Sequence, residues 1–280
     1  MGSSEWTLIF FTLIVQMCVG AFFLQEILLP QKTQNNPAHQ KLKYRMLLVL
    51  LVLMIIAVIL SFFHLGKPGN AIYSFNNLRA SWLSQEILML SVFTVLLALT
   101  AFISRRNPGK SILLRFISIL TMIAGWMLIY SMAMIYMMKT IPVWNSVTTM
   151  LEFISCSLIL GGMLVVSLSG RLMQEGYLSK RINILFLIII FLLVADISNS
   201  VYLFLQYREL EILQELLPGL GIIKTIMQIA ALLVLLFQFR SLRQKKKLVH
   251  IWFIMVFAAI LLSEIVGRYA FYASYVSPGV

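Results

Sequence analysis

The stretch FISILTMIAGWMLIYSMAMIYMM, residues 116–138, contains no charged residue and lies between Arg115 and Lys139. A helix needs about 20 mainly apolar residues to cross a hydrocarbon layer of about 30 Å, so this stretch is long enough to span a membrane. A strand of a transmembrane β-barrel would instead show about ten residues of alternating hydrophobicity. Residues 116–138 therefore predict a transmembrane helix.

Seven further mainly apolar stretches of similar length occur along the chain. No connection between them is long enough for a water-soluble domain. Across the sequence 61% of residues are hydrophobic and 11% are charged, whereas soluble domains have about 25% charged residues. We therefore expect an all-α polytopic membrane protein with a single transmembrane domain over residues 1–280. The eight expected helices run approximately over Thr7–Leu28, Met46–Leu65, Gln85–Ile103, Phe116–Met138, Val147–Leu168, Ile182–Leu205, Gly221–Phe239 and Val249–Tyr269.

The positions of Lys and Arg predict the orientation of these helices, because short cytoplasmic loops retain positive charge. Sixteen of the 22 basic residues lie in the four odd-numbered connections, so both termini are expected on the non-cytoplasmic side. These sixteen are Lys32, Lys41, Lys43, Arg45, Arg105, Arg106, Lys110, Arg115, Arg171, Lys180, Arg181, Arg240, Arg243, Lys245, Lys246 and Lys247. Their dispersal beside an anionic leaflet explains the net charge of +12 without nucleic-acid binding, which would use one basic patch.

The sequence contains few residues that could ligate a redox cofactor. A haem between helices usually takes a pair of His at one depth, but His39, His64 and His250 are expected at different depths. Cys18 and Cys156 are too few for an iron–sulfur cluster, which takes about four ligands, and scattered Met residues usually serve packing. We therefore expect no haem, no iron–sulfur cluster and no metal in this chain.

Ionisable residues inside membrane spans are costly and are therefore candidates for function. His64 lies near the outer end of the second expected helix, Glu86 begins the third, and the short loop between them keeps both at one depth. A His and a carboxylate facing an apolar cleft suit quinol oxidation, because one can hydrogen-bond a ring hydroxyl while either accepts a proton as electrons leave. A helix cap at the membrane interface explains the same two residues equally well.

Other polar residues toward the outer side admit two interpretations each. Glu264 and Arg268 stand at i and i+4, which favours a local ion pair. Asp196 lies deeper, and with residues 198–200 it forms either a polar seam for a proton or water, or hydrogen bonds between helices. Glu152, in the first turns of the fifth expected helix, is a further member of this outer group.

Five groups of residues stand out along the chain: Met1-Gly2-Ser3 with Glu5-Trp6, residues 61–68 (SFFHLGKP), Asn76 with residues 80–87 (ASWLSQEI), residues 140–144 (TIPVW) with Gly161-Gly162, and residues 263–268 (SEIVGR) with Phe271-Tyr272. In this order they resemble the membrane anchor subunit of bacterial dimethyl sulfoxide reductases, the DmsC family. The resemblance spans nearly the whole chain, and its most specific part is the His-Leu-Gly-x-Pro segment followed by Ser-x-Glu.

The resemblance implies a haem-free, eight-helix anchor in the bacterial cytoplasmic membrane. Such a subunit is not itself the catalytic subunit. It oxidises menaquinol from the quinone pool and passes electrons to an iron–sulfur subunit, which feeds a molybdopterin catalytic subunit in anaerobic respiration.

By the same resemblance, the quinol site lies near the outer face and involves His64, Glu86 and the following loop with Gly66 and Ser74. Arg79 and Arg268, also toward the outer side, are further candidate ligands of the quinol. The sequence departs from the family in the loop, where Asn70 stands at a position that can be Arg in relatives and Lys67 is basic instead.

Two other functions stay open. A haem-free helical bundle with Asp196 in a span is also compatible with a transporter or channel. Such proteins usually show inverted repeats and broken helices near the bilayer midplane, and the sequence shows neither. A passive scaffold whose partner alone handles quinol is the third interpretation.

Overall fold

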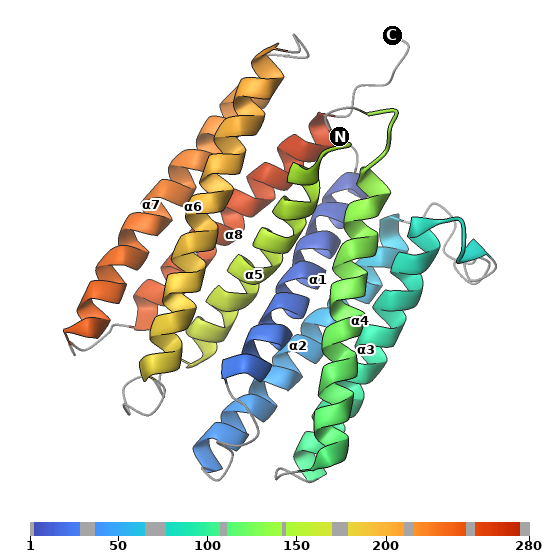
Figure 1. The fold of residues 1–280 in the computed structure, drawn as a ribbon, viewed down its shortest axis with the longest axis vertical. Helices are drawn as coiled ribbons and strands as arrows, with labels where there is room; N and C mark the ends of the chain where they lie inside the picture. The colour runs from blue at the N-terminus through green and yellow to red at the C-terminus, as the bar shows by residue number, and fades with distance from the viewer. Residues whose placement is uncertain are drawn as a thin grey trace. The chain divides into compact units, whose positions relative to one another are not determined.

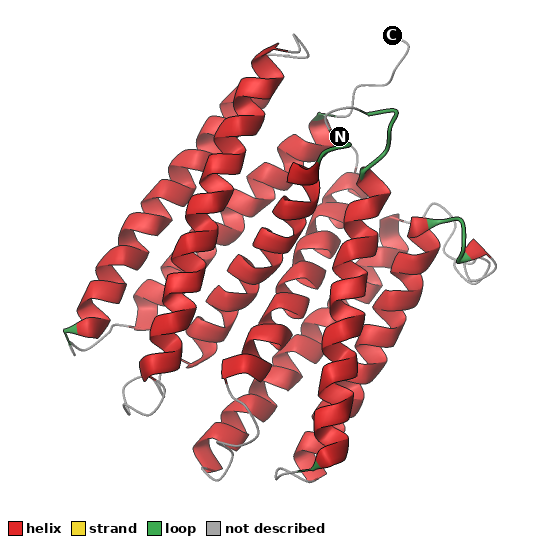
Figure 2. Ribbon diagram, viewed as in Figure 1, coloured by secondary structure: helices red, strands yellow, loops and turns green. Residues whose placement is uncertain are grey.

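A computed structural model describes residues 3–28, 37–64, 77–106, 111–141, 144–169, 179–209, 216–244 and 250–274. Over these ranges the protein forms eight helices and no strand (Figures 1 and 2). The helices are α1 (Ser3–Leu28), α2 (Pro37–His64), α3 (Trp82–Arg106), α4 (Ile112–Tyr136), α5 (Val147–Ser169), α6 (Ser179–Glu209), α7 (Leu216–Arg243) and α8 (His250–Ala273).

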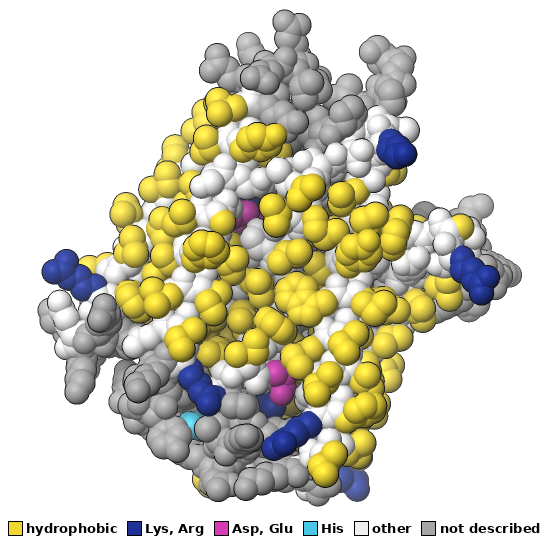
Figure 3. All heavy atoms as spheres, in the orientation of Figure 1, with side chains coloured by type: hydrophobic (Ala, Val, Ile, Leu, Met, Phe, Trp, Pro, Cys, Tyr) yellow, Lys and Arg dark blue, Asp and Glu magenta, His cyan; other side chains and the backbone are white. Residues whose placement is uncertain are grey.

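All eight helices are long and apolar enough to cross a membrane, which confirms the predicted all-α membrane fold. Helices suit this environment because each satisfies its backbone hydrogen bonds internally, where lipid offers none. Large apolar side chains such as Phe191 and Phe237 are 72% and 70% exposed, as expected for residues that face acyl chains. Figure 3 shows apolar side chains over much of the described part of the face that it draws. The predicted N-out, C-out orientation stays a prediction.

Two predicted loop segments are helical instead. α2 begins at Pro37, well before the expected start at Met46, so residues 37–45 continue the helix beyond the apolar stretch. α7 begins at Leu216, before the expected start at Gly221, so Leu217, Pro218 and Gly219 lie in its first turn. Proline is tolerated there because the first N–H groups of a helix have no partner within the helix.

The first compact unit covers residues 1–138, and its four helices pack as a ring in which α1 contacts α2 and α4, and α3 contacts the same two helices. Gly125 allows α4 to lie close to its neighbours, because a Cβ atom there would come within 3.0 Å of both Phe93 on α3 and Val19 on α1. The hydroxyl groups of Thr100 and Thr121 hydrogen-bond across the α3–α4 contact at 3.2 Å. Small and hydroxylated residues are typical of close helix packing in membranes.

The second compact unit covers residues 139–280 and repeats the same ring order, with α5 contacting α6 and α8, and α7 contacting α6 and α8. Trp144, just before α5, connects the start of this unit's chain segment to the C-terminal end of α8. Its indole Nε1–H lies 3.1 Å from both the Phe271 carbonyl and the Ser274 hydroxyl, and its ring stacks on Phe271 at 5.1 Å. The single domain expected over residues 1–280 stays a prediction.

Candidate functional site

The start of α3 positions Glu86, the carboxylate expected to contact quinol. Ser81 precedes the helix, and its hydroxyl accepts a hydrogen bond from the Ser84 amide at 3.4 Å, which is the arrangement of an N-cap. The Gln85 side chain donates to the Leu78 carbonyl at 3.0 Å and ties the preceding turn to the helix. Glu86 follows in the second turn and is only 7% exposed, whereas Leu83 is 44% exposed. The Glu86 side chain therefore faces the interior of the first unit.

Glu86 has no hydrogen-bond or ion-pair partner among the residues that the structure describes, although its side chain is buried. Buried carboxylates are normally paired, because an isolated charge in a medium of low dielectric is unfavourable. Trp82, one turn before Glu86 on α3, packs edge-on against Tyr130 on α4 with ring centroids 5.6 Å apart. A buried acid with an aromatic neighbour and free hydrogen-bonding capacity is suited to a polar headgroup on an apolar molecule.

The other residues predicted for the quinol site are described only in part. His64 is the last residue of α2, which contacts α3, but its side chain lies outside the described residues. Gly66, Lys67, Asn70 and Ser74 also lie outside them. Arg79 is exposed in the turn before α3. The expected meeting of His64 with Glu86 therefore stays a prediction.

Arg268, the remaining candidate, is buried in the second unit and belongs to a different environment. Its guanidinium group lies 4.1 Å from the centre of the Phe153 ring and 5.6 Å from that of Phe271. Both distances fit cation–π contacts, which help to stabilise a buried guanidinium group. The structure thus gives Arg268 a packing role between α5 and α8.

The second unit also contains a group of polar side chains, here called the buried cluster, with members from all four helices. Lys224 on α7 lies 3.3 Å from Glu152 on α5 and 3.3 Å from Asp196 on α6. The buried cluster comprises Glu152, Asp196, Lys224, Gln228, Glu264 and Arg268, all of them buried.

Gln228 connects the remaining carboxylate to this arrangement. Its Nε2 group donates to Asp196 Oδ2 at 2.6 Å and to Glu264 Oε1 at 3.2 Å, and Ser155 donates to Asp196 Oδ1 at 3.1 Å. Of the two interpretations of Asp196, hydrogen bonding between helices is therefore confirmed. The Ser198 hydroxyl, expected beside Asp196, instead donates to the Val194 carbonyl on its own helix.

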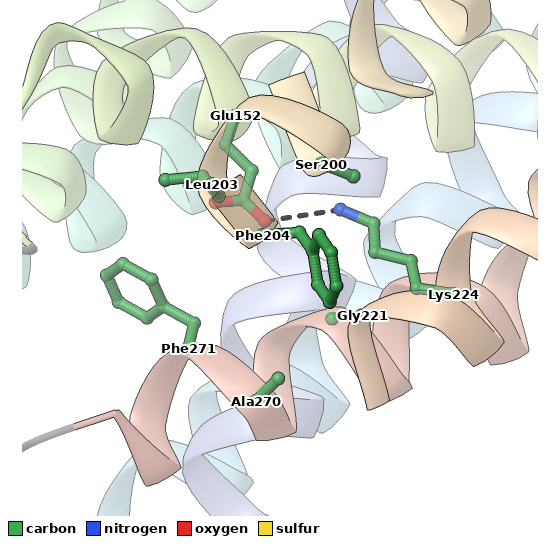
Figure 4. A pocket seen from close by; sticks show the side chains of 9 residues that line it. Glu152, Ser200, Leu203, Phe204, Gly221, Lys224, Ala270 and Phe271 are labelled. Carbon is green, nitrogen blue, oxygen red and sulfur yellow. Dashed lines mark hydrogen bonds and ion pairs between the residues drawn. The ribbon is translucent and has the colours of Figure 1, made fainter. Parts of the chain in front are cut away.

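A cavity of about 50 Å³ reaches this cluster at the end of the second unit where α5 and α7 begin. Glu152, Lys224 and Ser200 supply its polar lining, and Phe204 and Phe271 form part of its apolar wall. Figure 4 shows the Lys224 ammonium pointing at the Glu152 carboxylate beside this space. Since one water needs about 10–15 Å³ of such volume, the cavity can hold a few water molecules.

Two members of this arrangement were missed from the sequence. Neither Lys224 nor Gln228 was predicted as a functional residue, although a Lys within an apolar span usually indicates a buried carboxylate partner. Gly267 makes room for the Lys224 side chain, because a Cβ atom at position 267 would lie 2.7 Å from Lys224 Cδ. The spacing of Lys224 and Gln228 at i and i+4 was the signal that both face the same neighbours.

Comparison with known proteins identifies the family. Residues 1–274 match the DMSO reductase anchor subunit family, DmsC. This protein belongs to the DmsC family. The resemblance inferred from the residues is thereby confirmed, and with the eight helices it establishes a multi-pass membrane protein of the anchor-subunit type.

Three relatives show how far the DmsC similarity extends. The C subunit of the anaerobic dimethyl sulfoxide reductase of Escherichia coli strain K12 is 27% identical over 290 residues, which cover 100% of this protein and 98% of the relative. The corresponding C subunit from Haemophilus influenzae is 30% identical over 162 residues, 58% of this protein and 57% of the relative. The YnfH subunit of an E. coli anaerobic dimethyl sulfoxide reductase is 29% identical over 167 residues, 60% of this protein and 58% of the relative.

The described part of this DmsC protein contains no group of three or more His, Cys, Asp and Glu side chains arranged to hold a metal ion. Cys18 and Cys156 are both free and buried, one in each unit. The absence of haem, iron–sulfur cluster and metal stays a prediction.

Proposed function

We propose that this DmsC protein anchors a dimethyl sulfoxide reductase-like molybdopterin enzyme in the bacterial inner membrane and oxidises menaquinol for it. Quinol binds at the outer end of the first unit, and its electrons pass to an iron–sulfur subunit and then to the molybdopterin catalytic subunit. The observation that carries this proposal is Glu86, a buried carboxylate without a partner among the described residues, in the second turn of α3.

The chemistry requires acceptors for two protons, because oxidation of a quinol to a quinone releases two protons and two electrons. Glu86 accepts a hydrogen bond from one ring hydroxyl and then its proton. His64, at the end of α2, serves the other hydroxyl, since imidazole exchanges protons near neutral pH. The loop residues Gly66 and Ser74 and the exposed Arg79 complete the predicted headgroup site.

Electron transfer determines where the partner docks. The protein is expected to hold no redox cofactor, so the electron acceptor must lie close to the quinol. We therefore infer that the iron–sulfur subunit docks on the outer side, at the end of the first unit that carries His64 and Glu86.

The transporter alternative finds less support. Two successive repeats have inverted topology only if each contains an odd number of spans, and each of the two units has four helices among the residues that the structure describes. The inverted repeats common in transporters are therefore not formed by these units. Asp196, the residue that suggested transport, is paired with Lys224 and Gln228.

Substitution of the two proposed proton acceptors tests the function. Glu86→Gln and His64→Gln should each abolish quinol-dependent reduction by the assembled complex, while reduction with an artificial donor to the soluble subunits is retained. Glu26→Gln is the matched control, because Glu26 pairs with Lys43 at 2.8 Å in the same unit but near the C-terminal end of α1. Normal quinol turnover in the Glu86 and His64 variants would refute the proposal.

A further inference from the structure

The buried cluster of the second unit has more negative than positive groups. Glu152, Asp196 and Glu264 carry carboxylates, whereas Lys224 and Arg268 carry the only buried cationic groups among the described residues of this unit. Full ionisation would leave one negative charge unbalanced inside a membrane span. Such a charge is strongly unfavourable in a medium of low dielectric, so the cluster is neutral only when one carboxyl group is protonated.

Gln228 supplies a second observation at the same place. Its side chain is fully buried, and its Nε2 group already donates to both Asp196 and Glu264. Its Oε1 atom has no hydrogen-bond partner among the described residues. An ionised carboxylate cannot donate a hydrogen bond to this atom, but a protonated carboxyl group or a water molecule can.

We propose that the buried cluster is a proton-binding site, which holds one exchangeable proton shared among Glu152, Asp196 and Glu264 and exchanges it with water in the adjoining cavity. The exchange is a simple acid–base step, in which a carboxyl group gives its proton to water and becomes a carboxylate, with no redox change.

The geometry joins the three carboxyl groups in one network beside the cavity. The cavity is lined by Glu152 and Lys224, and Lys224 Nζ stands 3.3 Å from both Glu152 Oε1 and Asp196 Oδ2. Gln228 then joins Asp196 to Glu264. The described cavity brings water to this network at the end where α5 and α7 begin.

The described titratable residues around the cluster all enter this charge balance. α5 contributes Glu152 and the buried thiol of Cys156, α6 contributes Asp196, α7 contributes Lys224, and α8 contributes Glu264 with Arg268. The thiol is neutral when protonated and does not alter the count. The inference concerns the second unit alone and does not depend on quinol oxidation.

Infrared difference spectroscopy of the full-length protein in lipid nanodiscs at neutral pH tests the proposal through the C=O band of protonated carboxyl groups. Glu152→Gln, Asp196→Asn and Glu264→Gln should each remove the amplitude of one carboxyl group, because two carboxylates then balance two cations. A double variant with any two of these substitutions should lose the amplitude of no more than one carboxyl group. Lys224→Met should add one carboxyl group. In wild-type protein the band should shift on transfer to D₂O, because water reaches the cluster.

Two controls separate the cluster from other carboxyl groups. Glu86→Gln changes only the first unit. Any loss of band amplitude that it causes should therefore add to the loss caused by a cluster substitution when the two are combined. Glu26→Gln should leave the band unchanged, because Glu26 is paired with Lys43.

The proposal is overturned if none of the three cluster substitutions reduces the band, if two of them together remove two carboxyl groups, or if the wild-type band does not shift in D₂O. The three amide substitutions and the D₂O shift decide the question even if Lys224→Met does not fold.

Discussion

Replacing Gly267 with alanine should destabilise the second unit through the side chain of Lys224. The added Cβ atom would lie 2.7 Å from Lys224 Cδ, 3.0 Å from Cε and 3.1 Å from Nζ. Non-bonded carbon atoms prefer about 3.5–4.0 Å, so the Lys224 side chain would have to move by roughly 1 Å. The ion pairs with Glu152 and Asp196, both at 3.3 Å, resist this movement.

The expected magnitude follows from overpacking, which costs about 1–3 kcal/mol. The lower part of this range applies if the Lys224 side chain shifts into the cavity, which it lines together with Gly267. Alanine also stabilises a helix relative to glycine by about 1 kcal/mol, so the comparison needs a second Gly→Ala variant. Gly219→Ala in α7 is suitable, because a Cβ atom there has no neighbour within 4 Å. Gly267→Ala should therefore be less stable than Gly219→Ala by about 1–3 kcal/mol.

Thermal unfolding in detergent, followed by loss of helical circular dichroism, measures this difference. At about 2–4 °C per kcal/mol, the midpoint of Gly267→Ala should lie about 2–12 °C below that of Gly219→Ala. In a Lys224→Met background the difference should shrink, because no carboxylate then holds the side chain in place. Equal midpoints for the two glycine variants, or the same difference in both backgrounds, would refute the proposed link to Lys224.

Two further predictions follow from the proposed function. The isolated subunit should show no haem absorbance, and a Soret band with stoichiometric iron would contradict the expectation of a cofactor-free anchor. Quinol oxidation by the complex in liposomes should generate no membrane potential of its own, since protons and electrons leave on the same side and the partner consumes protons there. A quinol-driven signal from a potential-sensitive dye that is abolished by Asp196→Asn would overturn this electroneutral scheme.

Part of the candidate site was predictable from the residues. Glu86 was expected at the start of the third span, and the structure buries it there. A carboxylate in an apolar stretch stands out in any sequence because the membrane penalises it. Its relation to His64 depends on side-chain positions in and beside a loop, and hydropathy contains no information about those positions.

The partners of the other buried charges were predictable only in part. The i, i+4 spacing of Glu264 and Arg268 favoured a pair on one helix, but the structure connects Glu264 to Gln228 on α7 and places Arg268 over Phe153 on α5. Local spacing identifies which residues share a face of one helix. It does not indicate which face of which neighbouring helix they meet.

The sequence by itself determined the eight helices and the membrane environment, because every span must be apolar and must satisfy its own backbone hydrogen bonds in lipid. Only the tertiary structure decided the arrangement into two rings of helices, the gathering of Glu152 and Asp196 around the Lys224 ammonium group, and the link from Asp196 through Gln228 to Glu264. The physical reason is that lipid is as apolar as the helix surfaces, so hydropathy does not specify which helices associate. Close packing and buried polar contacts make that choice, and both depend on how each helix is rotated about its axis.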